Sequence, residues 1–101
     1  MKIVWSPLAV ERASEIADYI AQNKPAAVVK WINVVFSKVK RLSSSPEIGR
    51  VVSEIKNDHF RDLIYGNYRI IYHIEKKQIS ILTIRHGRQI LPIEDIMTQI
   101  A

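Results

Sequence analysis

Four arginines and one histidine in the second half of the chain have side chains that bind phosphate or acidic groups. Arg61 and Arg69 lie on either side of a predicted hairpin turn, and Arg85, His86 and Arg88 follow a later apolar run. Guanidinium groups bind phosphate and carboxylate through paired hydrogen bonds. Side chains at strand ends are held rigidly and still reach solvent. We therefore expect this cationic cluster to contact a phosphate backbone or an acidic partner.

Cleavage of RNA is one reaction that these residue types permit. Cleavage of RNA by its own 2′-hydroxyl needs an acid, a base and cations at the phosphate. His86 would serve as acid or base, a role to which histidine side chains are suited, while Arg69 and Arg85 would hold the phosphate. A nucleobase of the RNA would stack on Tyr65 or Tyr72.

Each of these side chains also has a purely structural interpretation. His86 precedes a glycine in a predicted turn, where a histidine is usually just solvated. Arg61 is next to Asp62 and would form an ion pair at a strand edge. Arg69 would pair within the sheet. The residues alone leave both interpretations open.

Alternating apolar residues predict the strands that carry the cluster. Runs rich in β-branched and aromatic residues predict strands at Lys2–Trp5, Phe60–Ile64, Arg69–Ile74 and Ile79–Ile84. Gly66 falls in a hairpin turn between the second and third strands, and a charged break separates the third from the fourth. Alternation also places Tyr68, Ile70, Tyr72 and Ile74 on one face, and Arg69, Ile71 and His73 on the other.

Two helices are predicted between the first and second strands. Ser6 is suited to cap a helix that begins at Pro7 and ends near Asn23. Pro25 begins a second helix, which runs to about Leu42. A short final helix is expected after Pro92. The order β-α-α-β-β-β predicts an α+β fold, with a helical hairpin packed on a small, mainly antiparallel sheet.

At about 100° per residue, the apolar side chains of the second helix cover an arc of roughly 220°. This arc is wider than the apolar stripe that a helix needs to face a core. Most of this arc is expected to be buried. Part of it, Trp31 or Val34 in particular, is a candidate surface for a partner.

Length and composition predict one soluble domain spanning residues 1–101. Hydrophobic residues make up 48% of the chain and charged residues 25%, which is ordinary for a globular protein. The net charge is +5, which weakly favours nucleic acid or an acidic protein as partner. Cysteine is absent, the histidines lack metal-ligand spacing, and no apolar run is long enough to span a membrane. We expect a cytoplasmic protein without metal or cofactor.

The order of several short motifs resembles the ParE branch of the RelE/ParE superfamily of toxins. These toxins belong to type II toxin–antitoxin systems. The motifs, from one end of the chain to the other, are Val4-Trp5-Ser6, Pro25-Ala26-Ala27, Ile48-Gly49-Arg50, Arg61-Asp62-Leu63, Gly66-Asn67-Tyr68-Arg69-Ile70-Ile71-Tyr72 and His86-Gly87-Arg88. Each motif is weak alone, but their order and spacing extend over about ninety residues.

The resemblance implies one of two activities. RelE-like members cleave messenger RNA on the ribosome, using lysines near the second strand and a carboxyl-terminal tyrosine or histidine–tyrosine pair. ParE-like members lack that set and inhibit DNA gyrase, which causes growth arrest. Here His86 is followed by Gly87, and Lys56 is the only lysine near the second strand. The resemblance thus favours a non-enzymatic gyrase inhibitor, with a ribosome-dependent endoribonuclease or a degenerate member that only binds its antitoxin as alternatives.

The resemblance also implies partners, and the apolar arc and the cationic cluster suggest the residues that would contact them. A cognate antitoxin would wrap the toxin and form a hetero-oligomer with it, contacting Trp31, Val34 and Tyr72. The target, gyrase or else the ribosome and its message, would contact the cationic cluster. That cluster consists of Arg61, Arg69, Arg85, His86 and Arg88.

Overall fold

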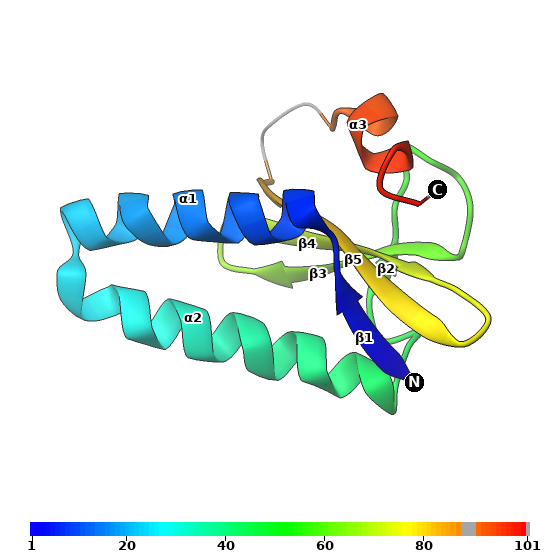
Figure 1. The fold of residues 1–101 in the computed structure, drawn as a ribbon, viewed down its shortest axis with the longest axis horizontal. Coiled ribbons are helices and arrows are strands. Elements are labelled where there is room, and N and C mark those ends of the chain that lie inside the picture. The colour runs from blue at the N-terminus through cyan, green and yellow to red at the C-terminus, as the bar shows by residue number, and fades with distance from the viewer. Residues whose placement is uncertain (88–90, 101) are drawn as a thin grey trace.

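The computed structural model describes residues 1–87 and 91–100 of the chain. Two long helices lie side by side next to a five-stranded sheet, an α+β arrangement that confirms the predicted fold class (Figure 1). The elements in chain order are β1 (Lys2–Trp5), α1 (Pro7–Asn23), α2 (Pro25–Lys40), the 3-10 turn η1 (Arg41–Ser43), β2 (Arg50–Val51), β3 (Phe60–Tyr65), β4 (Tyr68–Ile74), β5 (Gln78–His86) and α3 (Ile93–Met97). The two-residue strand β2 adds to the predicted order.

The sheet has the strand order β1-β5-β4-β3-β2. Strands β3, β4 and β5 form the predicted antiparallel meander, and β1 pairs with β5 in parallel at one edge. The β3–β4 turn contains Gly66 with φ +58°, a conformation that glycine adopts at little cost. The antiparallel pairing of β4 with β5 places the start of β4 beside the end of β5, where Tyr68 pairs with His86.

A single serine joins the first helix to the sheet. The side chain of Ser6 accepts a hydrogen bond from the backbone N–H of Ala9 at 3.0 Å, which caps α1 as predicted. The same hydroxyl donates to the carbonyl of Leu82 at 2.8 Å. The start of α1 is therefore fixed to the middle of β5.

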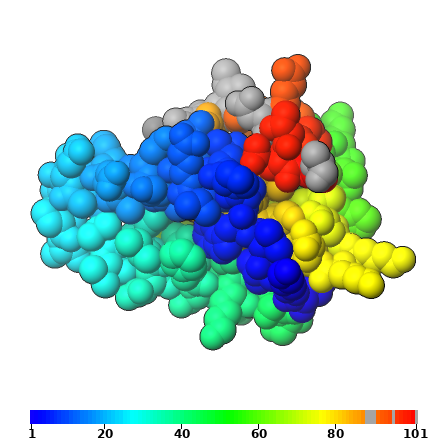
Figure 2. Space-filling view, in the orientation of Figure 1, coloured from blue at the N-terminus to red at the C-terminus, as the bar shows by residue number. Residues whose placement is uncertain are grey.

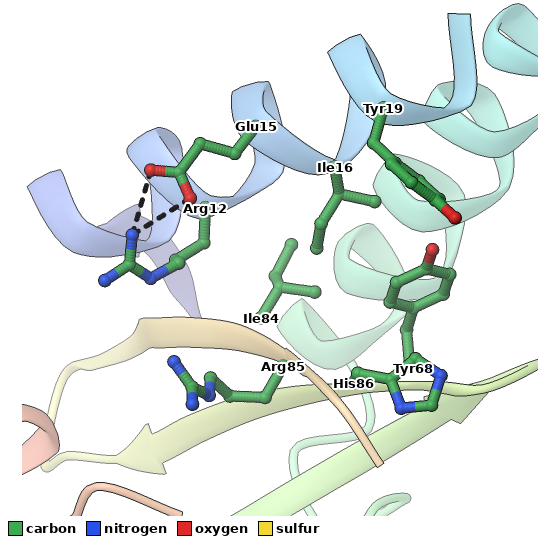
Figure 3. Close-up of a pocket in the computed structure, with 8 residues that line it drawn as sticks. All are labelled: Arg12, Glu15, Ile16, Tyr19, Tyr68, Ile84, Arg85 and His86. Carbon is green, nitrogen blue, oxygen red and sulfur yellow. Dashed lines mark hydrogen bonds and ion pairs between the residues drawn. The ribbon is translucent and has the colours of Figure 1, made fainter. Parts of the chain in front are cut away.

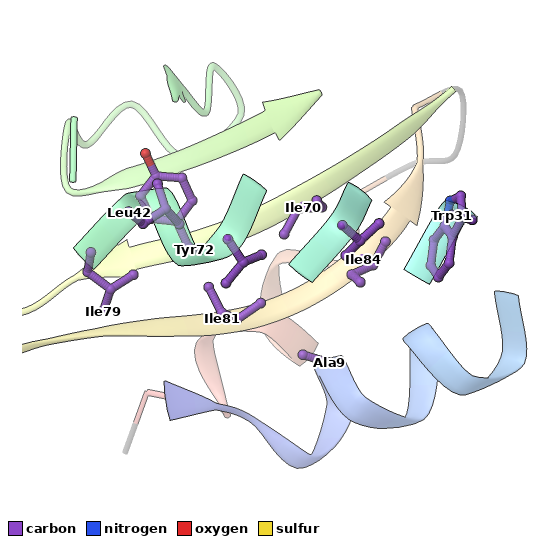
Figure 4. Packing of buried hydrophobic residues seen from close by; sticks show 10 residues of the cluster. Ala9, Trp31, Leu42, Ile70, Tyr72, Ile79, Ile81 and Ile84 are labelled. Atoms are coloured by element: carbon purple, nitrogen blue, oxygen red, sulfur yellow. The ribbon is translucent and has the colours of Figure 1, made fainter. Parts of the chain in front are cut away.

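The main core fills the space between the helices and one face of the sheet (Figure 4). Ile70 and Tyr72 of β4 point into it, whereas Ile71 points to the other face, so the predicted alternation is confirmed. The buried members of this core are Ala9, Trp31, Val35, Val39, Leu42, Ile70, Tyr72, Ile79, Ile81 and Ile84.

A second, smaller core covers the opposite face of the sheet. Segments before β3 and after β5 pack there against Ile71, and the buried members are Val52, Phe60, Ile71, Leu82, Leu91 and Ile96. Both faces of the sheet are therefore partly covered, which the sequence pattern of the strands did not predict.

A β-bulge interrupts the register between β4 and β5. Ile71 pairs with Thr83 but Tyr72 pairs with Ile81, so Leu82 is an extra residue in β5. The bulge lets Ile81 and Ile84 face the same core although they are three residues apart. It thereby sets the faces of the sheet on which Arg85 and His86, the last two residues of β5, lie.

Candidate functional site

A pocket of about 370 Å³ opens between α1 and the adjacent ends of β4 and β5 (Figure 3). We refer to it as the end pocket. Its lining residues are Arg12, Glu15, Ile16, Tyr19, Tyr68, Ile84, Arg85 and His86. Two residues of the predicted cluster, Arg85 and His86, are thus brought together at a concave surface.

Cross-strand packing holds the histidine and a tyrosine of the end pocket. His86 is the register partner of Tyr68, and their rings meet edge to face with centroids 5.9 Å apart. On its other side Tyr68 meets Trp31 edge to face at 5.6 Å. Gly87 closes the strand end, because its N–H donates to the carbonyl of Asn67 at 2.6 Å. His86 is therefore a half-buried residue at a strand end and not a loosely solvated turn histidine.

Helix α1 supplies the opposite wall of the end pocket. Arg12, Ile16 and Tyr19 recur at helical spacing on one side of α1, and Arg12 donates to both carboxylate oxygens of Glu15 at 2.9 and 3.0 Å. The sequence did not predict that these residues line a site. Their common helix face was visible in the spacing, but the strand end that they meet depends on the packing of α1 against β5.

Arg69, by contrast, is an internal residue. It is 8% exposed, and its guanidinium donates to Asp62 at 2.8 Å and to both oxygens of Glu54 at 2.8 and 3.2 Å. Asp62 is 1% exposed and also accepts two bonds from Arg50. The hypothesis of pairing within the sheet therefore describes Arg69, and a phosphate would have to displace two carboxylates to reach it.

Electrostatics within this network favour the charged forms. The hydrogen bond from Arg69 lowers the pKa of Glu54 to about 2, and the two carboxylates, Glu54 first, raise the pKa of Arg69. Opposite charges in close contact stabilise each other's ionised state. The network is thus a clamp that links β3, β4 and the segment after β2.

Arg61 also has a structural role. Its guanidinium donates to the backbone carbonyls of Asp58, Glu47 and Gly49 at 2.9, 3.2 and 3.1 Å. It does not pair with Asp62, because neighbouring residues on a strand point to opposite faces. Arg61 therefore fixes the loops on either side of β2.

Tyr72, predicted to contact an antitoxin, lies in the core with no exposed surface (Figure 4). Its hydroxyl donates to the carbonyl of Pro46 at 2.7 Å and accepts from the N–H of Gly49 at 3.0 Å. Burial raises the pKa of this phenol. The side chain anchors the loop after η1, and it offers no surface to a partner.

The wide apolar arc of α2 is divided between core and surface. Trp31 is buried at 7% exposure and Val34 is half-buried, whereas Val29 and Phe36 are 63% and 52% exposed. The surplus apolar surface predicted for this helix therefore exists, but it lies mainly at Val29 and Phe36.

An apolar groove of about 540 Å³ runs between the two helices. We refer to it as the helix groove; it is lined by Trp5, Val10, Ala13, Ser14, Ala17, Trp31, Ile32, Val35 and Phe36. Val10 is 55% exposed, and the rings of Trp5 and Phe36 lie 5.1 Å apart. Figure 2 shows α1 and α2 adjacent on one face of the molecule, with β1 beside them. An amphipathic segment would bury its apolar side here.

Arg88, the remaining member of the predicted cluster, lies outside the described residues. Within residues 1–87 and 91–100, no group of histidine and carboxylate side chains is placed to hold a metal ion. In the same ranges no helix has the length and apolarity needed to cross a membrane.

Comparison with known proteins agrees with the resemblance seen in the motifs. A solved structure of the chromosomal ParDE toxin–antitoxin system from P. aeruginosa matches the fold with a TM-score of 0.70, at 20% sequence identity. The match covers 85% of this chain and 95% of that one. No curated protein matches the sequence. The family model for the ParE toxin of the type II toxin–antitoxin system parDE matches residues 3–91, so the chain belongs to the ParE toxin family.

Proposed function

We propose that this ParE-family toxin acts in the cytoplasm by inhibiting DNA gyrase, without catalysis, and that a cognate antitoxin neutralises it. Family membership and the ParE-type sequence His86-Gly87-Arg88 support gyrase as the target. The end pocket and its rim are the proposed target surface, because Arg85 and His86 are the members of the predicted cluster that line a concave surface.

One observation carries the non-enzymatic interpretation: Arg69 and His86 lie on opposite faces of the sheet. Arg69 is the register partner of Arg85, and the next pair along the strands is Tyr68 with His86. Because side chains alternate between faces, a phosphate held by Arg69 would not meet His86. Arg69 is also already bound by Asp62 and Glu54. Of the two arginines in the nuclease hypothesis, Arg69 is therefore not placed to act with His86, which supports a toxin without catalysis.

The helix groove is the proposed site for the antitoxin. Its lining is almost entirely apolar, and Val10 and Phe36 expose more than half of their side chains beside it. An amphipathic segment of the antitoxin would bury this surface, as helices do in apolar grooves of other proteins. Exposed apolar patches of this kind mark interaction sites. A second copy of the toxin in the groove would instead give a homodimer in the absence of antitoxin.

A supercoiling assay with purified gyrase tests the proposed target. The toxin should block supercoiling of relaxed plasmid at stoichiometric concentrations, and prior addition of antitoxin should restore it. In parallel, a reconstituted translation reaction should keep its message intact in the presence of toxin. Cut message with unaffected gyrase would contradict the proposal, and a lack of effect in both reactions would favour a member that only binds its antitoxin.

A further inference from the structure

We propose that the helix groove selects its partner helix by charge. The flank of that helix facing α1 carries basic residues, and the flank facing α2 carries an acidic residue. The inference rests on the proposed function, because the partner is the segment of the antitoxin that fills this groove. It adds which antitoxin sequences the groove accepts and which it rejects.

The two helices that form the groove carry opposite charge. Helix α1 has three carboxylates and one arginine, whereas α2 has three lysines and no carboxylate. The two helices lie side by side along their length (Figure 1). The whole chain has a net charge of +5, so the acidic surface of α1 is a local feature that the overall charge conceals.

Two of the carboxylates border the apolar lining on the side of α1. Residues three or four positions apart are neighbours on a helix surface. Ser14 lines the groove, Glu11 lies three residues before it and Asp18 four residues after it. Both carboxylates are exposed, and within residues 1–87 and 91–100 neither forms an ion pair. They are about 10 Å apart along the helix axis, so a partner helix lying along α1 would meet them with basic residues about two turns apart.

A lysine borders the lining on the side of α2. Phe36 lines the groove with 52% of its surface exposed, and Lys40 follows it by one helical turn. Lys40 is exposed and forms no ion pair in the part of the chain that the structure describes. A carboxylate on the other flank of the partner helix would meet this lysine. Lys30 is also exposed, but at about 100° per residue it lies about 120° around the helix from Phe36 and does not line the groove.

Charges at the edge of an apolar interface discriminate between partners more than they add affinity. The apolar lining would hold any amphipathic helix, whereas a like charge placed against either edge would be repelled. A helix with one basic and one acidic flank satisfies both edges by adopting one of the two directions along the groove. A helix with two acidic flanks would place a carboxylate against Glu11 or Asp18. A uniformly acidic segment is therefore not the best partner, although the toxin as a whole is basic.

Three helical peptides with the same leucine stripe test the proposal by isothermal titration into the purified full-length toxin. The mixed peptide carries lysines on one flank and glutamates on the other, the acidic peptide carries glutamates on both flanks, and the basic peptide carries lysines on both. The mixed peptide should bind at least about fivefold more tightly than either of the others. This difference should shrink in about 0.5 M salt, because salt screens exposed charges.

Charge reversal on each side of the groove should change the preferred peptide. Glu11→Lys combined with Asp18→Lys makes the α1 side basic, and the acidic peptide should then bind most tightly. Lys40→Glu makes both sides acidic, and the basic peptide should then bind most tightly. Lys30→Glu makes the same charge change outside the groove and should leave the mixed peptide preferred.

Titration of the antitoxin into the same variants separates selection by charge from the placement of the antitoxin. If Phe36→Asp weakens the complex but the charge reversals beside the groove do not, the groove binds the antitoxin and selection by charge is wrong. If Phe36→Asp has no effect on the complex, the placement of the antitoxin is wrong, and this proposal fails with it.

Three results with the peptides would also overturn the proposal. The first is equal affinity of the three peptides for the wild type, or a preference that stays the same in all variants. The second is that the wild type binds the acidic peptide most tightly, which the net charge of the toxin alone would explain. The third is that no peptide binds, as expected if a second copy of the toxin fills the groove.

Discussion

Arg69 of β4 donates to the carboxylate of Asp62 on the neighbouring strand β3 at 2.8 Å, and both side chains are at least nine-tenths buried. Asp62→Ala should destabilise the protein by about 3 kcal/mol, because removing one partner of a buried pair leaves the other charge poorly compensated. Urea unfolding monitored by tryptophan fluorescence measures the change. Glu15→Ala breaks an exposed ion pair and should cost less than about 1 kcal/mol. Similar losses in the two variants would contradict a structural role for Arg69.

The same network predicts how stability changes in acid. The pKa of Glu54 is about 2 in the folded protein, against an ordinary value of 4.5. Below about pH 4.5 the unfolded chain binds a proton that the folded protein does not, so stability falls as the pH falls toward 2. Glu54→Gln should be less stable than the wild type at pH 7 but should lose less stability between pH 5 and pH 3. Unfolding curves with parallel pH dependence in both proteins would contradict this.

The contact between Gly49 and Tyr72 leaves no room for a larger residue. A Cβ on Gly49 would lie 2.6 Å from the hydroxyl of Tyr72 and 2.6 Å from the carbonyl of Asp62. Gly49→Ala should therefore destabilise the protein by about 1–3 kcal/mol, the usual cost of overpacking. Gly87→Ala is the matched control, since its Cβ would meet the nearest atom at 3.4 Å. Thermal unfolding of both variants measures the difference in stability. Equal melting temperatures would show that a Cβ at Gly49 is tolerated.

Local patterns predicted the elements of this fold well, and tertiary packing explains what they missed. Alternation and capping gave the strands, the two helices and the faces of β4, because these depend on residues close in sequence. Pairing of Arg69 within the sheet was one of two interpretations from the sequence. The choice between them depends on Glu54, fifteen residues away, and on a second core over its face of the sheet. The motif that carries the resemblance therefore includes residues with a structural role, such as Arg69.

The residues of the end pocket and the helix groove could also be predicted only in part from the sequence. Arg85 and His86 were predicted as a cluster from their position after an apolar run, and the structure places them in one pocket. Their partners Arg12 and Tyr19 are more than sixty residues away in the sequence, so only the packing of α1 against β5 identifies them. Likewise the apolar arc of α2 was evident, but only the fold shows that Phe36 is exposed and Trp31 is not.

The helix groove makes a specific prediction about antitoxin binding. Phe36→Asp should weaken the complex by more than about 2 kcal/mol, because it places a charge in the apolar groove at a residue expected to be central to the interface. Val51→Asp, on the exposed edge strand β2, is the matched control and should leave affinity nearly unchanged. Titration of the purified antitoxin into each variant measures both. If Val51→Asp has the larger effect, the antitoxin binds elsewhere.

Variants of the cationic strand end separate a binding toxin from a nuclease. For a gyrase inhibitor, His86→Ala should reduce toxicity only modestly, because one lost contact is typically worth about 1–2 kcal/mol. Arg85→Glu or Arg88→Glu should reduce it more, through repulsion as well as the lost contact. For a nuclease with His86 as acid or base, His86→Ala alone should lower the rate about 10²–10⁴-fold. Growth assays of the three variants give the comparison, with antitoxin binding as the control for folding. Complete loss of toxicity in His86→Ala alone, with cut messages in the wild type, would replace gyrase inhibition by RNA cleavage as the function of this toxin.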